Sequence, residues 1–147
     1  MFCFSSFRQD SASKEKSDVA MTEIIDLSKR SGRVEVRLSG RWIGADLHLA
    51  IFGGDRPHIG AVALSASHPS LKNPEQEDVT TSVIAVTGHK EDLLARNAAQ
   101  RIASASRRTT CVSCGIHLDE ISKEEIRLVQ ALVEDLVDDF LHRLKTS

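Results

Sequence analysis

The sequence contains no tyrosine and one tryptophan, and aromatic residues make up only 4% of its 147 residues. Proteins that bind single-stranded nucleic acids stack the bases on aromatic side chains, so this scarcity argues against such a platform. Lysine and arginine form no dense run and the formal net charge is −2, whereas a phosphate-backbone binder normally carries a basic stripe. We therefore expect no nucleic-acid partner, and expect small molecules or proteins instead.

Long apolar runs and numerous cysteines are also missing. No apolar stretch approaches the roughly 20 residues that cross a bilayer, so no membrane partner is expected. Three cysteines without a secretory signal indicate reduced thiols and a cytoplasmic protein. Cys111 and Cys114 form a C-x-x-C pattern, but a zinc site needs further ligands, and positions i and i+3 of a strand point to opposite faces. We interpret this pair as structural.

Patterned sequence begins after residue 21. Residues 1–21 are rich in Ser, Lys, Asp and Glu without periodicity, which is typical of a disordered extension. Residues 22–147 suffice for a single domain with its own core. Alternating or β-branched apolar positions predict strands; these are expected at 34–38, 47–52, 60–66, 79–86 and 109–114, with a weaker one at 22–27. Pro69 and Pro74 predict a loop over 67–78.

Two segments have helical periodicity. Residues 90–106 are alanine-rich and place Leu94, Ala98 and Ile102 four residues apart. Ser122 and Glu125 form a capping box ahead of a long apolar stripe. The fold class that follows is α+β, with a mostly antiparallel β-sheet and two packed helices at 90–106 and 122–144.

Three glycine- and histidine-bearing loops follow predicted strands, at 53–60, 88–92 and 115–119. We expect strand 60–66 to form a hairpin with 47–52 and to pair antiparallel with 79–86. A right-handed crossover through the first helix then makes 109–114 run parallel to 79–86. All three loops would lie at one edge of the sheet, so His58, His89 and His117 are expected to converge.

The converging loops carry the chemistry of an anion site. Gly53, Gly54 and Gly60 permit close backbone approach. Arg56 presents a planar fork that suits a phosphate or carboxylate. The amides near Gly88 open a helix, and helix N-termini favour anions.

The three histidines suggest a metal ion as an alternative ligand. Imidazoles at His58, His89 and His117 could hold a divalent metal with one position unfilled. Both the anion site and the metal site compete with a purely structural interpretation, because Gly-Gly loops are often only tight turns and a histidine at a helix start is often a cap. The sequence has no H-E-x-x-H, nucleophile elbow, P-loop or G-x-G-x-x-G motif, so nothing identifies a catalytic residue.

The runs GGDRPHIGAVALS, VTGHKEDLLAR and CGIHLDEIS resemble the family of LpdD-like prenylated-flavin chaperones. The resemblance covers roughly Val34 to Leu144. It implies a homodimer that binds prenylated flavin mononucleotide (FMN), made by a UbiX-type prenyltransferase, and delivers it to a UbiD-type decarboxylase. On the matching motifs, we place Glu91 and Asp119 as acceptors that orient the imidazoles. The expected cofactor-binding residues are Gly53, Gly54, Arg56, His58, Gly60, His89 and His117.

Two other functions compete with this non-catalytic chaperone. One is a small metalloenzyme that uses the three histidines. The other is a protein-assembly module that resembles proteasome assembly chaperones in its strand and helix layout and acts through its surfaces.

Overall fold

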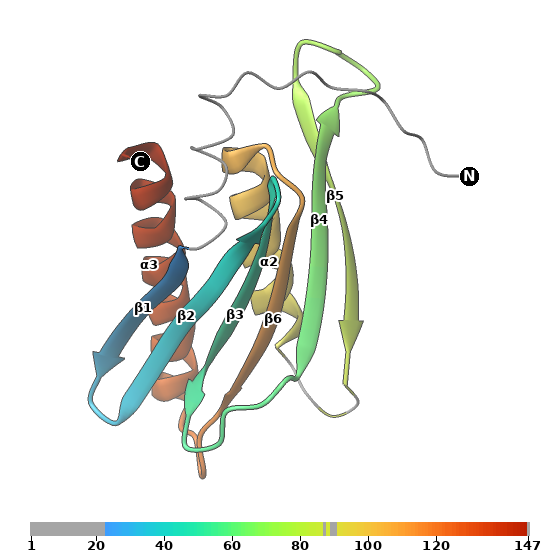
Figure 1. The fold of residues 1–147 in the computed structure, drawn as a ribbon. Helices are drawn as coiled ribbons and strands as arrows, with labels where there is room; N and C mark the ends of the chain where they lie inside the picture. Colours follow the sequence, from blue (N-terminus) through green and yellow to red (C-terminus); the bar gives the residue numbers. More distant parts are fainter. Residues whose placement is uncertain (1–22, 87, 89–90, 147) are drawn as a thin grey trace.

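The computed structural model of the chain describes residues 23–86, 88 and 91–146, and Figure 1 shows its fold. Six strands form one sheet in the order β1-β2-β3-β6-β4-β5. The elements are β1 (Ile24–Ser31), β2 (Val34–Ile43), β3 (Asp46–Gly54), β4 (Ala61–Pro69), β5 (Glu77–Ala85), α2 (Asp92–Ser106), β6 (Thr110–His117) and α3 (Lys123–Thr146). Only the β3–β6 pair is parallel among these strands. The α+β class with a mostly antiparallel sheet is confirmed.

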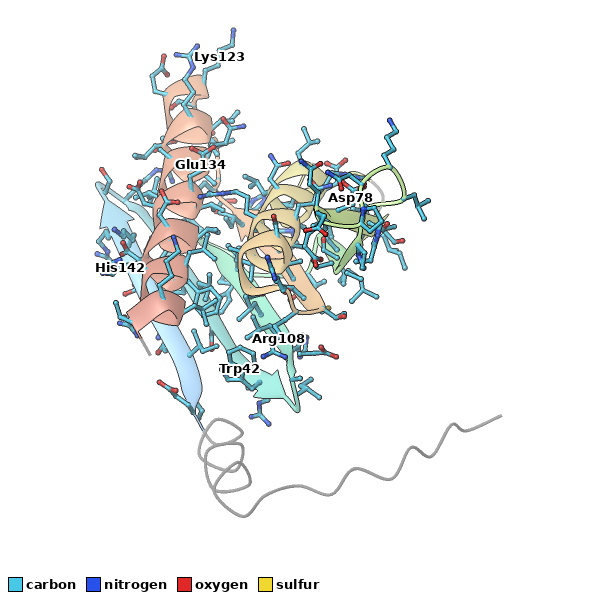
Figure 2. All side chains as sticks on the ribbon, turned by 90° about the horizontal axis from the view of Figure 1, so that it is seen from above. Trp42, Asp78, Arg108, Lys123, Glu134 and His142 are labelled. Atoms are coloured by element: carbon cyan, nitrogen blue, oxygen red, sulfur yellow. The ribbon has the colours of Figure 1, made fainter. Side chains whose placement is uncertain are left out.

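Both helices cover the same face of the sheet, and Figures 1 and 2 show them side by side there. Side chains alternate between the two faces of a strand, so Val34, Val36 and Leu38 of β2 are buried against the helices while Arg37 is exposed. The apolar stripe of α3 closes this core, with Phe140 only 2% exposed. The other face of the sheet has no covering element in the described part of the chain.

The predicted hairpin between β3 and β4 is wrong. Strand β6 lies between them, parallel to β3 and antiparallel to β4. It is also not adjacent to β5, although the two run in the same direction. A central place suits β6 because Val112 and Cys114 are almost completely buried and gain most from neighbours on both sides. Strand directions are unchanged, so the ends of β3, β5 and β6 still share one edge.

The loop predicted at 67–78 is too long. Strand β4 continues to Pro69 and β5 begins at Glu77. Side-chain hydrogen bonds extend this hairpin, since His68 Nε2 lies 2.7 Å from Thr80 Oγ1. The polar composition of residues 67–78 is typical of a loop, but polar side chains also pair across strands and stabilise the end of an exposed hairpin.

The predicted helices agree with the structure within the usual uncertainty of helix ends. Helix α2 begins at Asp92, and Lys90 lies outside the described residues. Helix α3 begins one residue after its cap, Ser122. The disordered extension predicted at 1–21 also falls outside the described residues. Within the described ranges, neither helix is long and apolar enough to cross a membrane.

Candidate functional site

Strands β3 and β6 end side by side at the lower edge of the sheet in Figure 1, and polar side chains from the loops that follow them contact one another. Gly54 and His117 are paired in the β3–β6 register. The chain then turns across the end of β6, and the amides of Asp55 and Arg56 both donate to the His117 carbonyl, at 2.7 and 3.3 Å. This crossing places the segment before β4 against the loop after β6. We call the resulting cluster the histidine rim; it consists of Arg56, His58, Glu91, His117 and Asp119.

Two glycines allow the loops of the rim to touch. Gly54 has a φ of +75°, and a Cβ there would overlap the His117 carbonyl oxygen. A Cβ on Gly115 would overlap the His58 carbonyl oxygen. Gly53 similarly faces the backbone of Glu35 on β2. The glycines predicted to approach a cofactor therefore have neighbours within the chain, and their contact with a cofactor stays a prediction.

His58 is fixed on both ring nitrogens. Nδ1 lies 3.1 Å from the Arg56 carbonyl oxygen, and Nε2 lies 3.1 Å from Glu91 Oε1. A carbonyl only accepts, so the hydrogen-bond network assigns a hydrogen to Nδ1. The two side chains are only 24% and 11% exposed, so this contact is largely shielded from solvent.

Gly60 leaves the space that the Glu91 carboxylate occupies. A Cβ on Gly60 would lie 2.6 Å from Glu91 Oε2 and 2.8 Å from Cδ. The carboxylate therefore rests on the backbone at the start of β4, where any larger residue would displace it. Glu91 Oε1 in turn contacts His58 Nε2, and its role as the acceptor that orients this imidazole for a ligand stays a prediction.

Arg56, His117 and Asp119 form the open side of the rim. His117 Nε2 lies 3.0 Å from Arg56 Nη2 and 3.1 Å from Asp119 Oδ1, and Arg56 also donates to Asp119. The Arg56 hydrogen bond, followed by that of His117, holds the pKa of the Asp119 carboxyl below its usual range. Arg56 and Asp119 are 69% and 57% exposed. The guanidinium can thus reach an external anion.

The structure brings two of the three predicted histidines together. The ring centroids of His58 and His117 are 6.4 Å apart, edge to face. His89 lies outside the described residues. Among the residues the structure describes, no group of three or more His, Cys, Asp or Glu is placed to hold a metal ion. The three-histidine metal site stays a prediction.

Arg33 supports the rim from the turn between β1 and β2, and no sequence pattern predicted this contact. Its Nε and Nη2 donate to the two carboxylate oxygens of Glu125 at 2.7 and 3.0 Å. Nη2 also donates to the Asp119 carbonyl at 2.9 Å, and Nη1 lies 3.3 Å from Asp55 Oδ2. That Asp55 oxygen accepts from the Asp119 amide at 2.9 Å. One guanidinium therefore joins three loops that are distant in sequence.

The predicted capping box is confirmed. The Ser122 hydroxyl accepts from the Glu125 amide at 3.1 Å, and Glu125 Oε2 accepts from the Ser122 amide at 3.0 Å. Arg33 and then the Ser122 amide lower the pKa of Glu125 to about 2. The same carboxylate thus starts α3 and anchors the rim through Arg33.

The two cysteines of β6 are free thiols. Cys114 is 1% exposed, and burial, followed by the charge of Glu91, raises its pKa to about 12. Burial also raises the pKa of Cys111. A buried thiol that resists ionisation is a poor nucleophile and metal ligand, which agrees with the structural interpretation of the C-x-x-C pattern.

Comparison with known proteins gives both a family and a fold. Residues 30–145 match the family model described as prenylated flavin chaperone LpdD-like domain. The chain is similar to "Protein LpdD" of Lactiplantibacillus plantarum, with 30% identity over 97 residues, which are 64% of this chain and 65% of that protein. It is also similar to a chain in the crystal structure of a chaperone complex for yeast 20S proteasome assembly, with a TM-score of 0.52, 15% identity, and coverage of 84% of this chain and 95% of that one. At that identity the second likeness concerns the fold alone.

Proposed function

Since its residues 30–145 match the family model, the chain belongs to the LpdD-like prenylated flavin chaperone family, and we propose that it binds prenylated FMN and delivers it to a UbiD-type decarboxylase. The flavin is cargo in this proposal, made by a UbiX-type prenyltransferase and released to the client enzyme. Besides the family match, one observation supports binding at this site. Arg56, His58 and His117 meet at one edge of the sheet, and a neighbouring group orients each of them.

The rim suits the polar parts of a flavin nucleotide. Arg56 uses one terminal nitrogen for its contacts with Asp119 and His117, so the rest of the guanidinium fork can donate to a phosphate. His117 uses Nε2 for its contacts with Arg56 and Asp119, so its Nδ1 edge can meet a carbonyl or nitrogen atom of an isoalloxazine ring, while His58, held by Arg56 and Glu91, packs beside it. Asp119 and Glu91 hold these groups in place before the cargo arrives, which reduces the entropy lost on binding.

The open side of the rim suits delivery. Arg56, His117 and Asp119 are between 41% and 69% exposed, so cargo bound there would stay accessible from solvent. A carrier must bind its cargo less tightly than the client does, and a few exposed hydrogen bonds, each worth about 0.5–1.5 kcal/mol, provide such modest affinity. The client can then take the cargo from the exposed side.

We further propose a cytoplasmic homodimer. The face of the sheet opposite the helices carries Leu64 and Ile84, which are 50% and 80% exposed. Exposed apolar groups on an uncovered sheet face are typical of an association surface. Sedimentation equilibrium should give twice the mass of the chain, and a Leu64→Lys, Ile84→Lys double variant should give the mass of one chain.

Cargo transfer tests the function. The chain is loaded with reduced prenylated FMN and mixed with apo-decarboxylase, and the recovered decarboxylase activity is measured against free cofactor at the same concentration. We expect faster recovery with the chain, and loss of this advantage in Arg56→Gln and His117→Gln. His48→Gln is the matched control, because His48 is exposed on β3, away from the rim. Equal recovery with and without the chain would contradict the proposal.

A further inference from the structure

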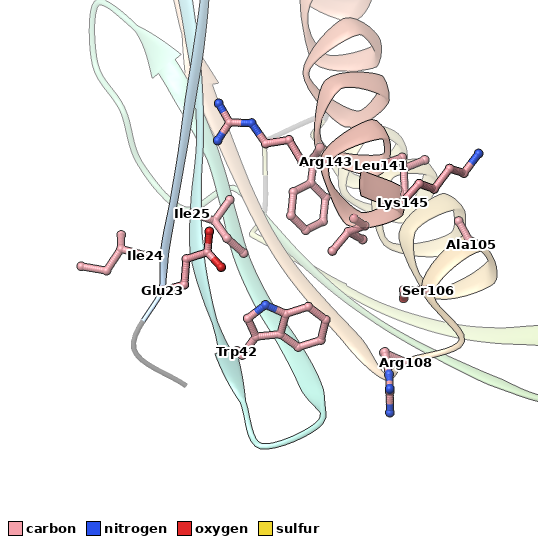
Figure 3. A pocket seen from close by; sticks show the side chains of 12 residues that line it. Glu23, Ile24, Ile25, Trp42, Ala105, Ser106, Arg108, Leu141, Arg143 and Lys145 are labelled. Atoms are coloured by element: carbon pink, nitrogen blue, oxygen red, sulfur yellow. The ribbon is translucent and has the colours of Figure 1, made fainter. Parts of the chain in front are cut away.

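An apolar cavity lies at the end of the sheet opposite the histidine rim. Figure 3 shows this cavity, of about 410 Å³, between the start of β1, the end of β2 and the last turns of both helices. None of the rim residues lines it. We call it the Trp42 pocket; the lining residues that matter here are Ile25, Trp42, Ala105, Phe140, Leu141 and Leu144.

The floor of the Trp42 pocket is apolar and firmly packed. Phe140 and Ile25 are 2% and 9% exposed. Trp42, Leu141 and Leu144 pack against the core but are only partly buried. An apolar cavity of roughly 150 Å³ can hold one benzene ring, so a pocket of about 410 Å³ has room for two aromatic rings. Burial of apolar side chains on this floor would remove both surfaces from water.

The sequence carries suitable side chains just upstream of the pocket. Glu23 is the first described residue and lines the pocket, so residues 1–22 join the fold at the pocket itself. Residues 8–18 have no apolar side chain larger than alanine, a composition typical of a linker. Three of the five phenylalanines of the sequence precede this polar stretch, at Phe2, Phe4 and Phe7.

The polar stretch is long enough for these phenylalanines to return to the pocket. A coil of about 15 residues, the length of the stretch from 8 to 22, has an average end-to-end distance of about 20 Å. Because Glu23 lines the pocket, one end of that coil is already in place. A tether of this kind gives its free end an effective concentration of about 1 mM. A modest affinity is therefore sufficient for the phenylalanines to occupy the pocket.

We propose that residues 2–7 bind in the Trp42 pocket of the same molecule. The phenylalanine rings lie on the floor that Phe140 and Ile25 form, with at least one ring against Trp42, because aromatic pairs favour offset or edge-to-face contact. The bound residues shield Trp42 from water and close the pocket to other apolar ligands. Residues 2–7 precede the part of the chain that matches the family model, so this inference does not rest on the proposed function.

The fluorescence of Trp42 reports on this binding directly, because the chain has one tryptophan and no tyrosine. Emission and its quenching by acrylamide are measured for the full chain and for a triple variant, Phe2→Ser, Phe4→Ser, Phe7→Ser. We expect red-shifted emission and more efficient quenching in the triple variant, since water and acrylamide then reach the indole ring. The matched control, Ser5→Ala, Ser6→Ala, changes the same stretch but keeps the phenylalanines, and it should behave as the parent does. Circular dichroism spectra check that all three chains fold.

A synthetic peptide of residues 1–9 tests whether occupancy of the pocket causes the shielding. Added to the triple variant, the peptide should restore the parent emission in a saturable way. We expect a dissociation constant of about 0.1 mM or lower, because a tethered concentration of about 1 mM then keeps the segment bound in about nine-tenths of the molecules. The same peptide with serine at its three phenylalanine positions should have no effect.

A nitroxide spin label on Cys3 shows where the segment binds, because this residue stands among the phenylalanines. In a Cys111→Ser background the one remaining other thiol is that of Cys114, which is 1% exposed and so protected from the label. The label should broaden the single indole N–H resonance of Trp42. The same label in the triple variant should leave this resonance sharp.

Three results would overturn the proposal. Equal acrylamide quenching in the parent and the triple variant would mean that the phenylalanines do not cover Trp42. A peptide without saturable effect on the triple variant would mean that they act away from the pocket. Broadening of the Trp42 resonance in an isotope-enriched chain by a separate, spin-labelled chain would assign the pocket to the segment of a second copy.

Discussion

Gly60→Ala should disturb the rim while it spares the fold. Gly60 does not have a positive φ, so the backbone accepts alanine. The new Cβ would meet the carboxylate of Glu91 at 2.6 Å, and this flexible end can move aside. The cost is the hydrogen bond between Glu91 and His58. A hydrogen bond to a charged group is worth about 1.5–3 kcal/mol. Alanine also lowers the conformational entropy of the unfolded chain, which stabilises the fold by about 0.4–1 kcal/mol. We expect a net loss of about 1–2 kcal/mol in the free energy of unfolding.

Gly54→Ala is the matched comparison, because the same atom is added at the same edge. Its φ of +75° makes alanine strained, by about 1–2 kcal/mol. The Cβ would also overlap the His117 carbonyl, which accepts from Asp55 and Arg56. Losing those two bonds adds about 1 kcal/mol each. We therefore expect about 3–4 kcal/mol for this variant.

Urea unfolding measures the free energies, and long-range ¹H–¹⁵N spectra report whether His58 Nε2 carries a hydrogen. In Gly60→Ala the Nε2 signal should change at neutral pH while the amide spectrum of the sheet stays the same. An unchanged Nε2 signal would show that Glu91 does not rest on Gly60. Equal destabilisation by the two variants would also refute the reasoning, because it would mean that both positions are constrained by backbone alone.

Three further predictions concern the surroundings of the rim. The pKa of Glu125 is lowered from 4.5 to about 2, so its carboxylate stabilises the fold above pH 4.5, and this stability should be lost as the pH falls from about 4.5 towards 2. Urea unfolding at a series of pH values should show that loss in the parent chain and a much smaller one in Arg33→Gln. Phe140→Ala leaves a cavity under α3 and should cost about 3–5 kcal/mol, visible as a lower melting temperature. Arg56→Lys keeps the charge but loses the planar fork, so it should weaken retention of prenylated FMN in equilibrium dialysis while Asp119 remains paired.

The convergence of the rim could be predicted because it depends only on strand direction. Strands β3, β5 and β6 point the same way whether or not β6 separates β3 from β4. The order of the strands could not be predicted, because the alternating pattern of β3 fits a hairpin partner and a parallel neighbour equally well. What placed β6 in the centre is the burial of Val112 and Cys114, which depends on helices that pack from elsewhere in the chain.

Interactions between residues close in sequence could be predicted, whereas interactions between distant residues could not. The capping box at Ser122 and Glu125 involves residues three apart, so spacing alone revealed it. The bond between Arg33 and Glu125 joins residues 92 apart, and no pattern in either segment indicates it. The glycines of the rim were recognised as positions of close approach, but what approaches Gly54 and Gly60 is the chain itself.

We have proposed that this chain carries prenylated FMN. The most direct measurement is the absorbance spectrum of the full chain purified after co-expression with a UbiX-type prenyltransferase, beside an Arg56→Gln, His117→Gln double variant treated identically. We predict flavin absorbance at a near-equimolar ratio in the parent and its loss in the variant. A colourless parent protein, with a prenyltransferase shown to be active in the same cells, would contradict the account.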